Sequence, residues 1–349
     1  VAGGMSVDRP IKLGISSCLL GNKVRFDGGH KFDPFLVNVL GAFVEYVPVC
    51  PEVESGFPVP REAFRLVGDP QDPRLLTRPT GVDATARMES WLEKRLPQLE
   101  REGLCGFVFK SQSPSSGMER VKVYNEKGVA EKKGVGLFAR ALMRRLPLLP
   151  VEEEGRLQDI GLRENFIERI FAVRRWQDLV AADGEAPAAI PSLTARQAEP
   201  RGSRDSSAAG VKAAKLVDFQ RRHKYLLMAH SPELARRLGA LAAQAGSRPL
   251  AGLLGEYEAL FLAALKQKAT VRKHANVLQH MLGYFKKQLD DFAKRELLQV
   301  IENYRQGLVP LIVPLTLLKH YIAKFRQPYL QDQVYLDPHP LELKLRNHA

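Results

Sequence analysis

The chain has 349 residues and a formal net charge of +13. This length exceeds what one hydrophobic core usually covers, so we expect two domains. No apolar run approaches the roughly 20 residues that cross a bilayer, and no charged-then-apolar signal pattern opens the sequence. The three cysteines are too few and too widely spread for a disulfide framework. These features exclude a membrane-spanning protein and a disulfide-stapled secreted protein, and they predict a cytoplasmic protein with reduced thiols.

Three apolar runs predict buried strands, and each run ends in small, polar or thiol residues. The runs cover residues 11–15, 43–49 and 106–110. The first stops at two serines and Cys18, the second stops at Cys50, and the third opens into a serine loop over 111–117. Because the carboxyl ends of parallel strands meet at one edge of a sheet, we interpret that edge as the candidate active site.

The other segments of this part predict the rest of a Rossmann-like α/β domain over 5–183. Helices are predicted over 33–40, 82–101, 134–146 and 160–180, a hairpin over 63–67 and 74–77, and short strands over 120–124 and 148–151. Residues 51–61 are rich in Pro and predict an irregular loop. Pro97 is expected to kink its helix or to end it early.

The composition changes at residue 184. Residues 184–211 are mostly Ala, Pro, Ser, Gly and Arg without periodicity, and they predict a flexible linker. Beyond the linker, helical periodicity with short polar breaks predicts an all-α helical domain over 212–349. Its expected helices cover 212–229, 232–245, 250–269, 271–288, 290–306 and 309–326.

Most of the positive charge lies in this last part. Residues 211–349 contain 22 Lys and Arg against 11 Asp and Glu, a net +11. This excess fits a polyanionic partner such as RNA or DNA, and it fits equally a helical domain whose solvated faces are rich in lysine. The spacings of His223, His230, His274 and His280 suit a metal site poorly, so we interpret these histidines as part of solvated basic faces.

Cys18 and Cys50 both follow a predicted strand, so their two thiolates could converge on one bound group. Thiolates suit soft metals and iron-sulfur clusters. The two residues are 32 positions apart without a CxxC pattern, however, so their spacing alone favours small buried side chains at strand ends. The serine loop is also open to two interpretations, a simple turn or an anion cradle to which Lys110 and Arg120 add charge.

Two sets of sequence motifs resemble known families. Over residues 11–149, the words S-S-C-L-L-G, V-R-F-D-G-G, V-C-P-E-V, P-V-P-R-E, F-K-S-Q-S-P-S-S-G and R-V-K-V-Y resemble, in order and spacing, the TudS-type thiouracil desulfidase family. From residue 215 onward, L-V-D-F-Q-R-R-H-K-Y-L-L-M-A-H-S-P, T-V-R-K-H-A-N-V-L-Q-H-M-L-G-Y-F-K and V-P-L-I-V-P-L-T-L-L-K-H-Y resemble the YbgA-type helical domain.

The first resemblance implies a cofactor and a set of site residues. In the desulfidase family three cysteines hold a [4Fe-4S] cluster, and its free iron accepts sulfur from a thiolated pyrimidine, giving hydrogen sulfide and the oxo base. By motif, Cys18 and Cys50 are the first two cluster ligands, Glu52 is the acid/base, and Ser113 lies beside the site. Without a cluster, Glu52 is an ordinary carboxylate at the start of a helix or loop. The residues expected to meet substrate are Arg25, Asp27, Lys110, Ser111, Ser115, Ser116 and Gly117.

The chain departs from this family at the third cluster ligand. The family motif S-P-S-C-G reads S-P-S-S-G here, so Ser116 stands at the ligand position. The third cysteine, Cys105, begins its strand, which places it roughly 20 Å from the serine loop at about 3.3 Å per residue. A serine oxygen is a harder and weaker iron ligand than a thiolate.

These observations lead to two hypotheses. The first is an iron-sulfur-dependent desulfidase, or a related sulfur-handling enzyme, that acts on a thiolated pyrimidine base, nucleotide or RNA. The basic helical domain would then bind the phosphate part of the substrate. The alternative is a non-catalytic nucleotide or nucleic-acid binding protein whose N-terminal domain has lost its cluster.

Overall fold

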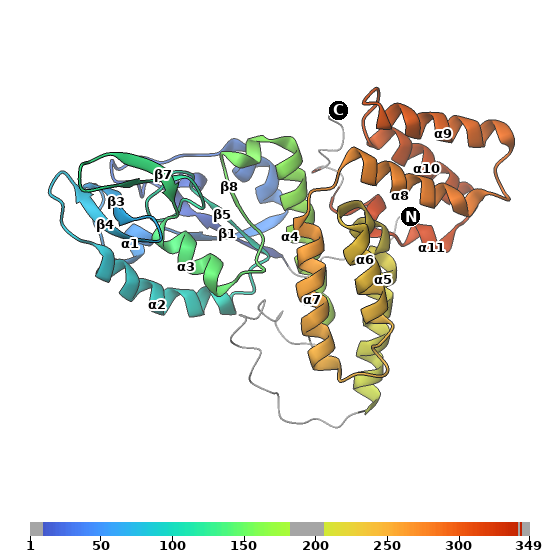
Figure 1. Ribbon diagram of the computed structural model, residues 1–349, viewed down its shortest axis with the longest axis horizontal. Helices are drawn as coiled ribbons and strands as arrows, with labels where there is room; N and C mark the ends of the chain where they lie inside the picture. Colours follow the sequence, from blue (N-terminus) through green and yellow to red (C-terminus); the bar gives the residue numbers. More distant parts are fainter. Residues whose placement is uncertain (1–9, 182–205, 341–342, 344–349) are drawn as a thin grey trace. The chain divides into compact units, whose positions relative to one another are not determined.

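The computed structural model describes residues 10–181, 206–340 and Leu343. It divides into two compact units (Figure 1): the first runs to Asp159, and the second contains Ile160–Leu179 and the chain beyond residue 200. Most of the predicted linker, residues 184–205, lies outside the described residues. The linker prediction is wrong for residues 206–211, because helix α5 already begins at Ser206.

A four-stranded parallel sheet in the order β2-β1-β5-β8 forms the centre of the first unit. Its strands are β1 (Ile11–Ser16), β2 (Val44–Val49), β5 (Gly106–Phe109) and β8 (Val151–Glu153). β1 and β5 are largely buried, as expected for apolar strands covered on both faces. Ser16 pairs with Val49 and Ile15 pairs with Val108, so the three strands predicted from apolar runs end at one edge. An α/β domain followed by a helical one is thereby confirmed.

A second sheet of the first unit has the order β4-β3-β6-β7. β3 (Ala63–Asp69) and β4 (Asp72–Arg78) form the predicted hairpin, and β6 (Val121–Tyr124) runs parallel to β3. β7 (Ala130–Gly134) was not predicted, because its residues A-E-K-K-G are mostly exposed and carry no apolar alternation. β7 forms because it pairs with β6 as a hairpin, so its backbone hydrogen bonds are satisfied without burial of its side chains.

The helices of the first unit differ from the predictions in detail. Figure 1 shows α2 (Thr85–Arg101) and α3 (Leu137–Arg145) along the same side of the unit. Pro97 does not end α2, because buried leucines on both sides of it keep the helix packed. A short helix, α1 (Pro51–Glu54), replaces the start of the predicted irregular loop, since a proline suits the first helical position. The helix predicted over 33–40 is a π-helical turn, Phe35–Val39, followed by a 3-10 turn.

The second unit is entirely helical in the residues described. Its helices are α4 (Ile160–Val180), α5 (Ser206–His230), α6 (Pro232–Ala242), α7 (Leu250–Lys266), α8 (Val271–Leu282), α9 (Asp291–Arg305), α10 (Ile312–Lys324) and α11 (Pro328–Gln331). Side chains of Ser231, Thr270 and Asp290 accept backbone amide hydrogen bonds and so begin α6, α8 and α9. No helix among residues 10–181 and 206–340 combines the length and apolarity needed to cross a membrane.

Helix α4 belongs to the second unit, which corrects the predicted domain boundary at residue 183. Trp176 of α4 stacks on Tyr257 of α7, with ring centroids 5.3 Å apart. Arg175 Nε donates to Nε2 of His223 on α5 at 3.0 Å, and Asn165 Nδ2 donates to the carbonyl oxygen of Leu265. α4 is buried on several faces, so it requires helical partners on more than one side.

The start of α3 packs against the serine loop, and this contact generates a stability prediction. The amides of Phe138 and Ala139 donate to the carbonyl oxygen of Ser115, and a Cβ at Gly136 would overlap that carbonyl group. Gly136→Ala should therefore lower the free energy of unfolding of the first unit by about 1–3 kcal/mol. Urea unfolding can be followed by the fluorescence of Trp91 in a Trp176→Phe background.

Gly155→Ala is the matched control for that variant. Gly155 lies in the same unit with helical backbone angles, and a Cβ there would meet Ser111 Oγ at an ordinary distance of 3.6 Å. We expect its unfolding midpoint to stay close to that of the parent protein. Equal midpoints for the Gly136→Ala and Gly155→Ala variants would contradict the close approach of α3 to the serine loop.

Candidate functional site

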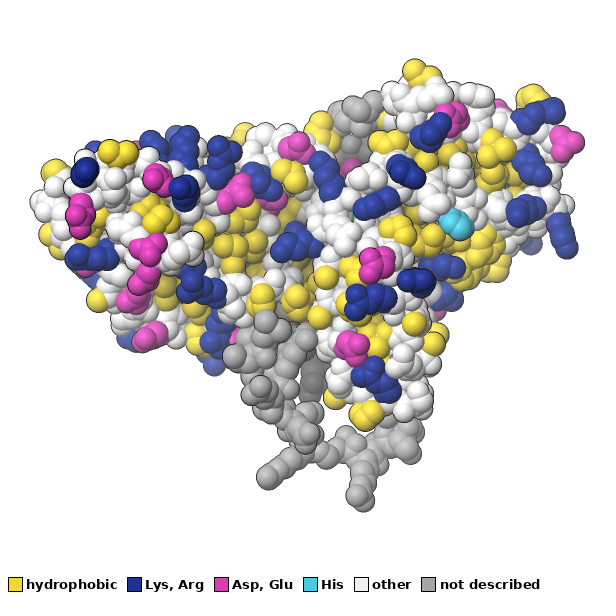
Figure 2. Space-filling view, viewed as in Figure 1, with side chains coloured by type: hydrophobic (Ala, Val, Ile, Leu, Met, Phe, Trp, Pro, Cys, Tyr) yellow, Lys and Arg dark blue, Asp and Glu magenta, His cyan; other side chains and the backbone are white. Residues whose placement is uncertain are grey.

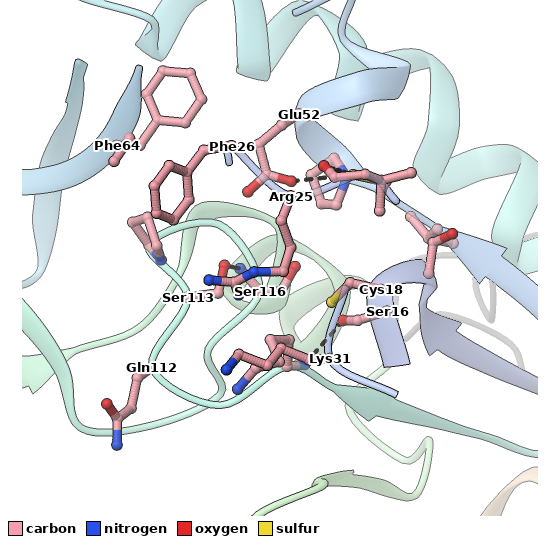
Figure 3. A pocket seen from close by; sticks show the side chains of 18 of the residues that line it. Ser16, Cys18, Arg25, Phe26, Lys31, Glu52, Phe64, Gln112, Ser113 and Ser116 are labelled. Carbon is pink, nitrogen blue, oxygen red and sulfur yellow. Dashed lines mark hydrogen bonds between the residues drawn. The ribbon is translucent and has the colours of Figure 1, made fainter. Parts of the chain in front are cut away.

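A cavity of about 450 Å³ lies at the carboxyl edge of the parallel sheet (Figure 3). Its wall is built from the segments that follow β1, β2 and β5, together with the start of β3. The predicted site residues that line it are Cys18, Arg25, Cys50, Glu52, Lys110, Ser111, Ser113 and Ser116. Residues far apart in the sequence therefore meet here because three parallel strands end side by side.

Three predicted site residues do not line this cavity. The Ser115 side chain is fully buried behind its wall and reaches Glu52 from there. Gly117 shapes the serine loop, since a Cβ there would crowd Val121 and the Ser113 carbonyl oxygen. Asp27 lies on the outside of its loop, where its carboxylate accepts a hydrogen bond from the amide of Gly29 at 3.0 Å.

Glu52 is the carboxylate in the cavity wall, and three side chains hold it. Its Oε1 accepts a hydrogen bond from the Ser115 hydroxyl at 2.5 Å. Its Oε2 lies 3.4 Å from the Cys50 thiol, which donates to it, and 3.8 Å from Nη2 of Arg61. The side chains of Glu52 and Arg61 are only 14% and 7% exposed. The carboxylate is therefore fixed in position and still reaches the cavity.

The two thiols that line the cavity are held in their protonated forms. Cys18 lies in a 3-10 turn, Ser17–Leu20, directly after β1, and Cys50 lies between β2 and α1. Burial raises the pKa of Cys18 to about 11. Burial, together with the neighbouring Glu52 carboxylate, raises the pKa of Cys50 to about 12. At neutral pH both groups are therefore S–H donors, and a metal ion could bind them only by displacing two protons.

A partly buried ion pair fixes the start of the serine loop. Glu154 accepts hydrogen bonds from Lys110 Nζ at 2.5 Å and from the amide and hydroxyl of Ser111, each at 2.7 Å. The amide of Lys110 donates to the hydroxyl of Ser16, which joins the ends of β5 and β1. Within the loop, the Ser113 hydroxyl accepts a hydrogen bond from the amide of Ser116 at 3.2 Å. The loop is thus tied to the sheet edge by polar contacts.

Sequence reasoning missed several residues of the cavity wall, among them two cationic and two aromatic side chains. Arg61, Lys31, Phe26 and Phe64 all line it. Arg61 and Phe26 lie inside the motifs P-V-P-R-E and V-R-F-D-G-G, so the motifs contained a signal for them. Lys31 and Phe64 carry no such signal, because only the fold brings them to this edge.

A second cavity, of about 530 Å³, shares wall residues with the first. Both are lined by Phe64, Ser111, Gln112 and Pro114. The second cavity is bordered by strands of the second sheet, and its cationic lining residues are Arg65, Arg78, Arg120, Lys122, Lys132 and Arg156. Arg65 and Arg78 lie against the Tyr124 ring, at 5.8 and 6.0 Å from its centroid. Arg120, predicted to add charge to the serine loop, adds it here.

The histidines of the second unit are not all solvated, which corrects part of that prediction. His223 is buried and accepts the hydrogen bond from Arg175, and burial together with that guanidinium lowers its pKa well below the usual value. His230 is also buried, with Nε2 3.0 Å from a Glu168 carboxylate oxygen. Both histidines face α4, which the prediction had placed in the other domain. His280 is exposed, as predicted.

Comparison with known proteins places the two units in known families. The family model for 2-thiouracil desulfurase matches residues 13–154, and the model described as a protein of unknown function (DUF1722) matches residues 224–340. The uncharacterized protein YbgA of Escherichia coli K12 is 32% identical over 139 residues, which are 40% of this chain and 82% of YbgA. The chain belongs to the YbgA family. It joins a 2-thiouracil desulfurase domain to the YbgA-type helical domain.

A solved structure adds a further relative of the first domain. The [4Fe-4S]-dependent thiouracil desulfidase TudS is 32% identical to this chain, with a TM-score of 0.36. The match covers 44% of this chain and 97% of TudS. The two family models and the similarity to YbgA confirm the resemblance stated from motifs at the level of family.

The donor set of this YbgA-family chain does not fit a cluster held by three thiolates. Cys18 and Cys50 line the cavity, but Ser116 supplies a hydroxyl at the third family position. The remaining cysteine, Cys105, precedes β5, and its amide donates to the Lys12 carbonyl oxygen at the opposite end of the strand from the cavity. No group of three or more His, Cys, Asp and Glu side chains among residues 10–181 and 206–340 is arranged to hold a metal ion.

Restoring the third thiol tests this reading of the donor set. Ser116→Cys should raise the iron and acid-labile sulfide content after anaerobic reconstitution, because it supplies the missing soft ligand. Both quantities should rise from well below to near four atoms per chain, which is about one cluster. Cys105→Ala is the control and should leave both quantities unchanged. A full cluster in the parent protein, lost on Cys105→Ala, would show that Cys105 is a ligand.

Proposed function

We propose that the first unit of this chain is a sulfur-handling enzyme of the desulfidase type, acting on a thiolated pyrimidine. The carrying observation is the Glu52 carboxylate, fixed by Ser115 and Arg61 in a cavity that also presents two thiols. The 2-thiouracil desulfurase match supports the same class of reaction. The sheet order β2-β1-β5-β8 supports a Rossmann-like fold, in which ligands bind at the carboxyl ends of the strands.

The proposed reaction is a hydrolytic exchange of sulfur for oxygen. Water adds to the thiocarbonyl carbon, the carbon–oxygen bond forms, and the carbon–sulfur bond breaks. The sulfur leaves with the two protons of that water as hydrogen sulfide, and the oxo pyrimidine remains. No electrons are gained or lost, so the chain needs no oxidant or reductant for this exchange.

The residues of the cavity have chemical roles in this exchange. Glu52 accepts a proton from the attacking water and returns it to the leaving sulfur. Arg25 and Lys31 supply positive charge where negative charge develops on sulfur. The S–H groups of Cys18 and Cys50 can donate hydrogen bonds to the same sulfur, since their raised pKa values keep them protonated. The proposed exchange uses no cluster, because the donor set lacks a third thiolate.

The phosphate-bearing part of a nucleotide or RNA substrate would bind in the second cavity. The second cavity adjoins the first and is lined by six cationic side chains against two carboxylates, Glu119 and Glu153. The second unit adds further positive charge, and Figure 2 shows its Lys and Arg side chains spread among apolar ones on the face drawn. The cationic wall of the second cavity supports an anionic extension of the substrate, since cations of this kind neutralise phosphates. The charge of the second unit supports polyanion binding by that unit itself.

A non-catalytic binding protein is the second candidate function. Ser116 at the third ligand position favours it, because a hydroxyl replaces a soft ligand there. The two candidates differ in one outcome: both predict saturable binding of a thiolated pyrimidine, and only the enzyme predicts release of sulfide.

Glu52→Gln tests the enzymatic proposal. We expect the parent protein to release sulfide from 2-thiouracil or 4-thiouracil, and the variant to lose about a hundredfold or more in kcat, because general acid–base groups contribute at least that much. The amide retains an acceptor for the Ser115 hydroxyl, so binding should persist. Cys105→Ala is the control with unchanged kcat. Binding without sulfide release in the parent protein would favour the second candidate function.

Salt dependence tests the proposed polyanion binding. The full chain is required, because a segment beginning at residue 212 lacks α4 and its contacts with α5 and α7. We expect the affinity of the full chain for single-stranded RNA to fall steeply as the salt concentration rises. Reversing the exposed charges Arg272, Lys286 and Lys287 to Glu should make the slope of log K against log salt shallower by about two. Each lost phosphate contact contributes about 0.7 to that slope on a single strand.

The control for this experiment reverses three exposed charges elsewhere. Lys94, Arg101 and Lys127 of the first unit are exposed and lie outside both cavity walls. Their reversal to Glu changes the net charge by the same amount. It should change the slope of log K against log salt less than the reversal of Arg272, Lys286 and Lys287 does. RNA affinity that is absent at physiological salt, or equal slopes for both triple variants, would remove RNA binding by the second unit.

A further inference from the structure

We propose that Phe26 is the residue that stacks on the flat face of the pyrimidine ring and thereby positions its thiocarbonyl carbon near Glu52. This inference rests on the proposed function, because it concerns the ligand of the same cavity. It assigns a positioning role to the Phe26 side chain, with Phe64 as the second aromatic wall of the cavity.

Phe26 lines the cavity and is also exposed to solvent. Its side chain is 40% exposed, and it lines the cavity with Phe64. Figure 3 shows the two rings at one side of the cavity, with Glu52 and Arg25 beside Phe26. An apolar ring left in water is stabilised when another apolar face covers it. A planar conjugated ring is therefore a suitable ligand for this side of the cavity.

The loop that carries Phe26 is rigid, so the ring has a fixed place. The Arg25 amide donates to the Gly29 carbonyl oxygen at 3.2 Å, and the Gly28 amide donates to the Arg25 carbonyl oxygen at 3.0 Å. Gly28 adopts φ +75°, a left-handed conformation that favours glycine. The Arg25 guanidinium lies 5.4 Å from the centroid of the Phe26 ring. These contacts hold the ring toward the cavity without burying it in the core.

A second arginine, Arg61, connects Phe26 to the acid/base group. The amide of Arg61 donates to the Phe26 carbonyl oxygen at 2.8 Å, and its Nη2 lies 3.8 Å from Glu52 Oε2 and 3.1 Å from the Val24 carbonyl oxygen. The backbone of Phe26 and the carboxylate of Glu52 are therefore fixed relative to each other. A ring stacked on Phe26 would keep its edge at a constant distance from Glu52, which favours attack on one carbon.

Stacking predicts a specific pattern of substrate selectivity. Any pyrimidine has a π face, so stacking on Phe26 favours cyclic thiocarbonyl compounds and gives no advantage to small acyclic ones such as thiourea. Polar contacts from Glu52 and the thiols would act on both kinds of compound. The ratio of kcat/KM for 2-thiouracil to that for thiourea therefore isolates the contribution of the aromatic side chain.

Phe32 provides a matched control on the same stretch of chain. It is 43% exposed, close to the value for Phe26, and it lies six residues further on between the same two strands. Phe32 is not part of the cavity wall, and its ring faces the backbone at Gly21. Substituting either phenylalanine removes an equally exposed ring, so a difference between the two variants comes from the cavity.

The experiment compares the full-length variants Phe26→Ala, Phe26→Tyr and Phe32→Ala. For Phe26→Ala we expect two constants to rise about 5- to 150-fold, the range measured for one base–aromatic stack. They are KM for 2-thiouracil and the dissociation constant of uracil in equilibrium dialysis. The 2-thiouracil to thiourea selectivity should fall by a similar factor. Phe26→Tyr keeps an aromatic ring, so its KM, its dissociation constant for uracil and its selectivity should stay close to those of the parent protein. Phe32→Ala should match the parent protein in the same three quantities.

Each outcome of this experiment supports or overturns the inference. Turnover of 2-thiouracil with unchanged KM and selectivity in Phe26→Ala would overturn the role of Phe26 and leave the proposed function intact. Uracil and 2-thiouracil binding without turnover, weakened by Phe26→Ala alone, would support the role of Phe26 and overturn the enzymatic proposal. The absence of both binding and turnover in the parent protein would overturn both.

Discussion

The parallel pairing of β1 with β2 and with β5 is the constraint on which the candidate site depends. It brings the ends of three strands to one edge and so unites Cys18, Cys50 and the serine loop, which are far apart in the chain. The hydrogen bond from the Lys110 amide to the Ser16 hydroxyl fixes two of these ends to each other. Short polar contacts of this kind leave room for a cavity while holding its wall in place.

Charge and protonation then decide what chemistry the cavity supports. Among the described residues that line it, four are cationic and one, Glu52, is a carboxylate. Burial raises the pKa of both thiols and so opposes their ionisation. Ser115 and Arg61 hold the Glu52 side chain in position by direct contact. Such a wall suits a polar, sulfur-bearing ligand that gains negative charge during reaction. It is less suited to a metal that needs several soft anionic ligands.

The sequence predicted those features that depend on local pattern. Apolar runs that stop at Cys18 and Cys50 identified two strand ends, because buried parallel strands are continuous apolar stretches. Features that depend on tertiary contact were not predictable. β7 has no apolar pattern and forms only by pairing with β6. α4 was assigned to the wrong domain because its packing partners lie more than 40 residues away in the sequence. Lys31 and Phe64 lie in the cavity wall only because the folded chain brings them to the sheet edge, and no sequence motif marks them.

The central claim is that water replaces sulfur on a pyrimidine bound in this cavity. Incubation of the full chain with 2-thiouracil in water enriched in oxygen-18, followed by mass spectrometry of the product and a sulfide assay, tests it most directly. The account predicts uracil that carries one oxygen-18 atom, with one sulfide released for each uracil formed. Uracil without the label, or labelled uracil without sulfide, would contradict hydrolytic desulfuration at this site.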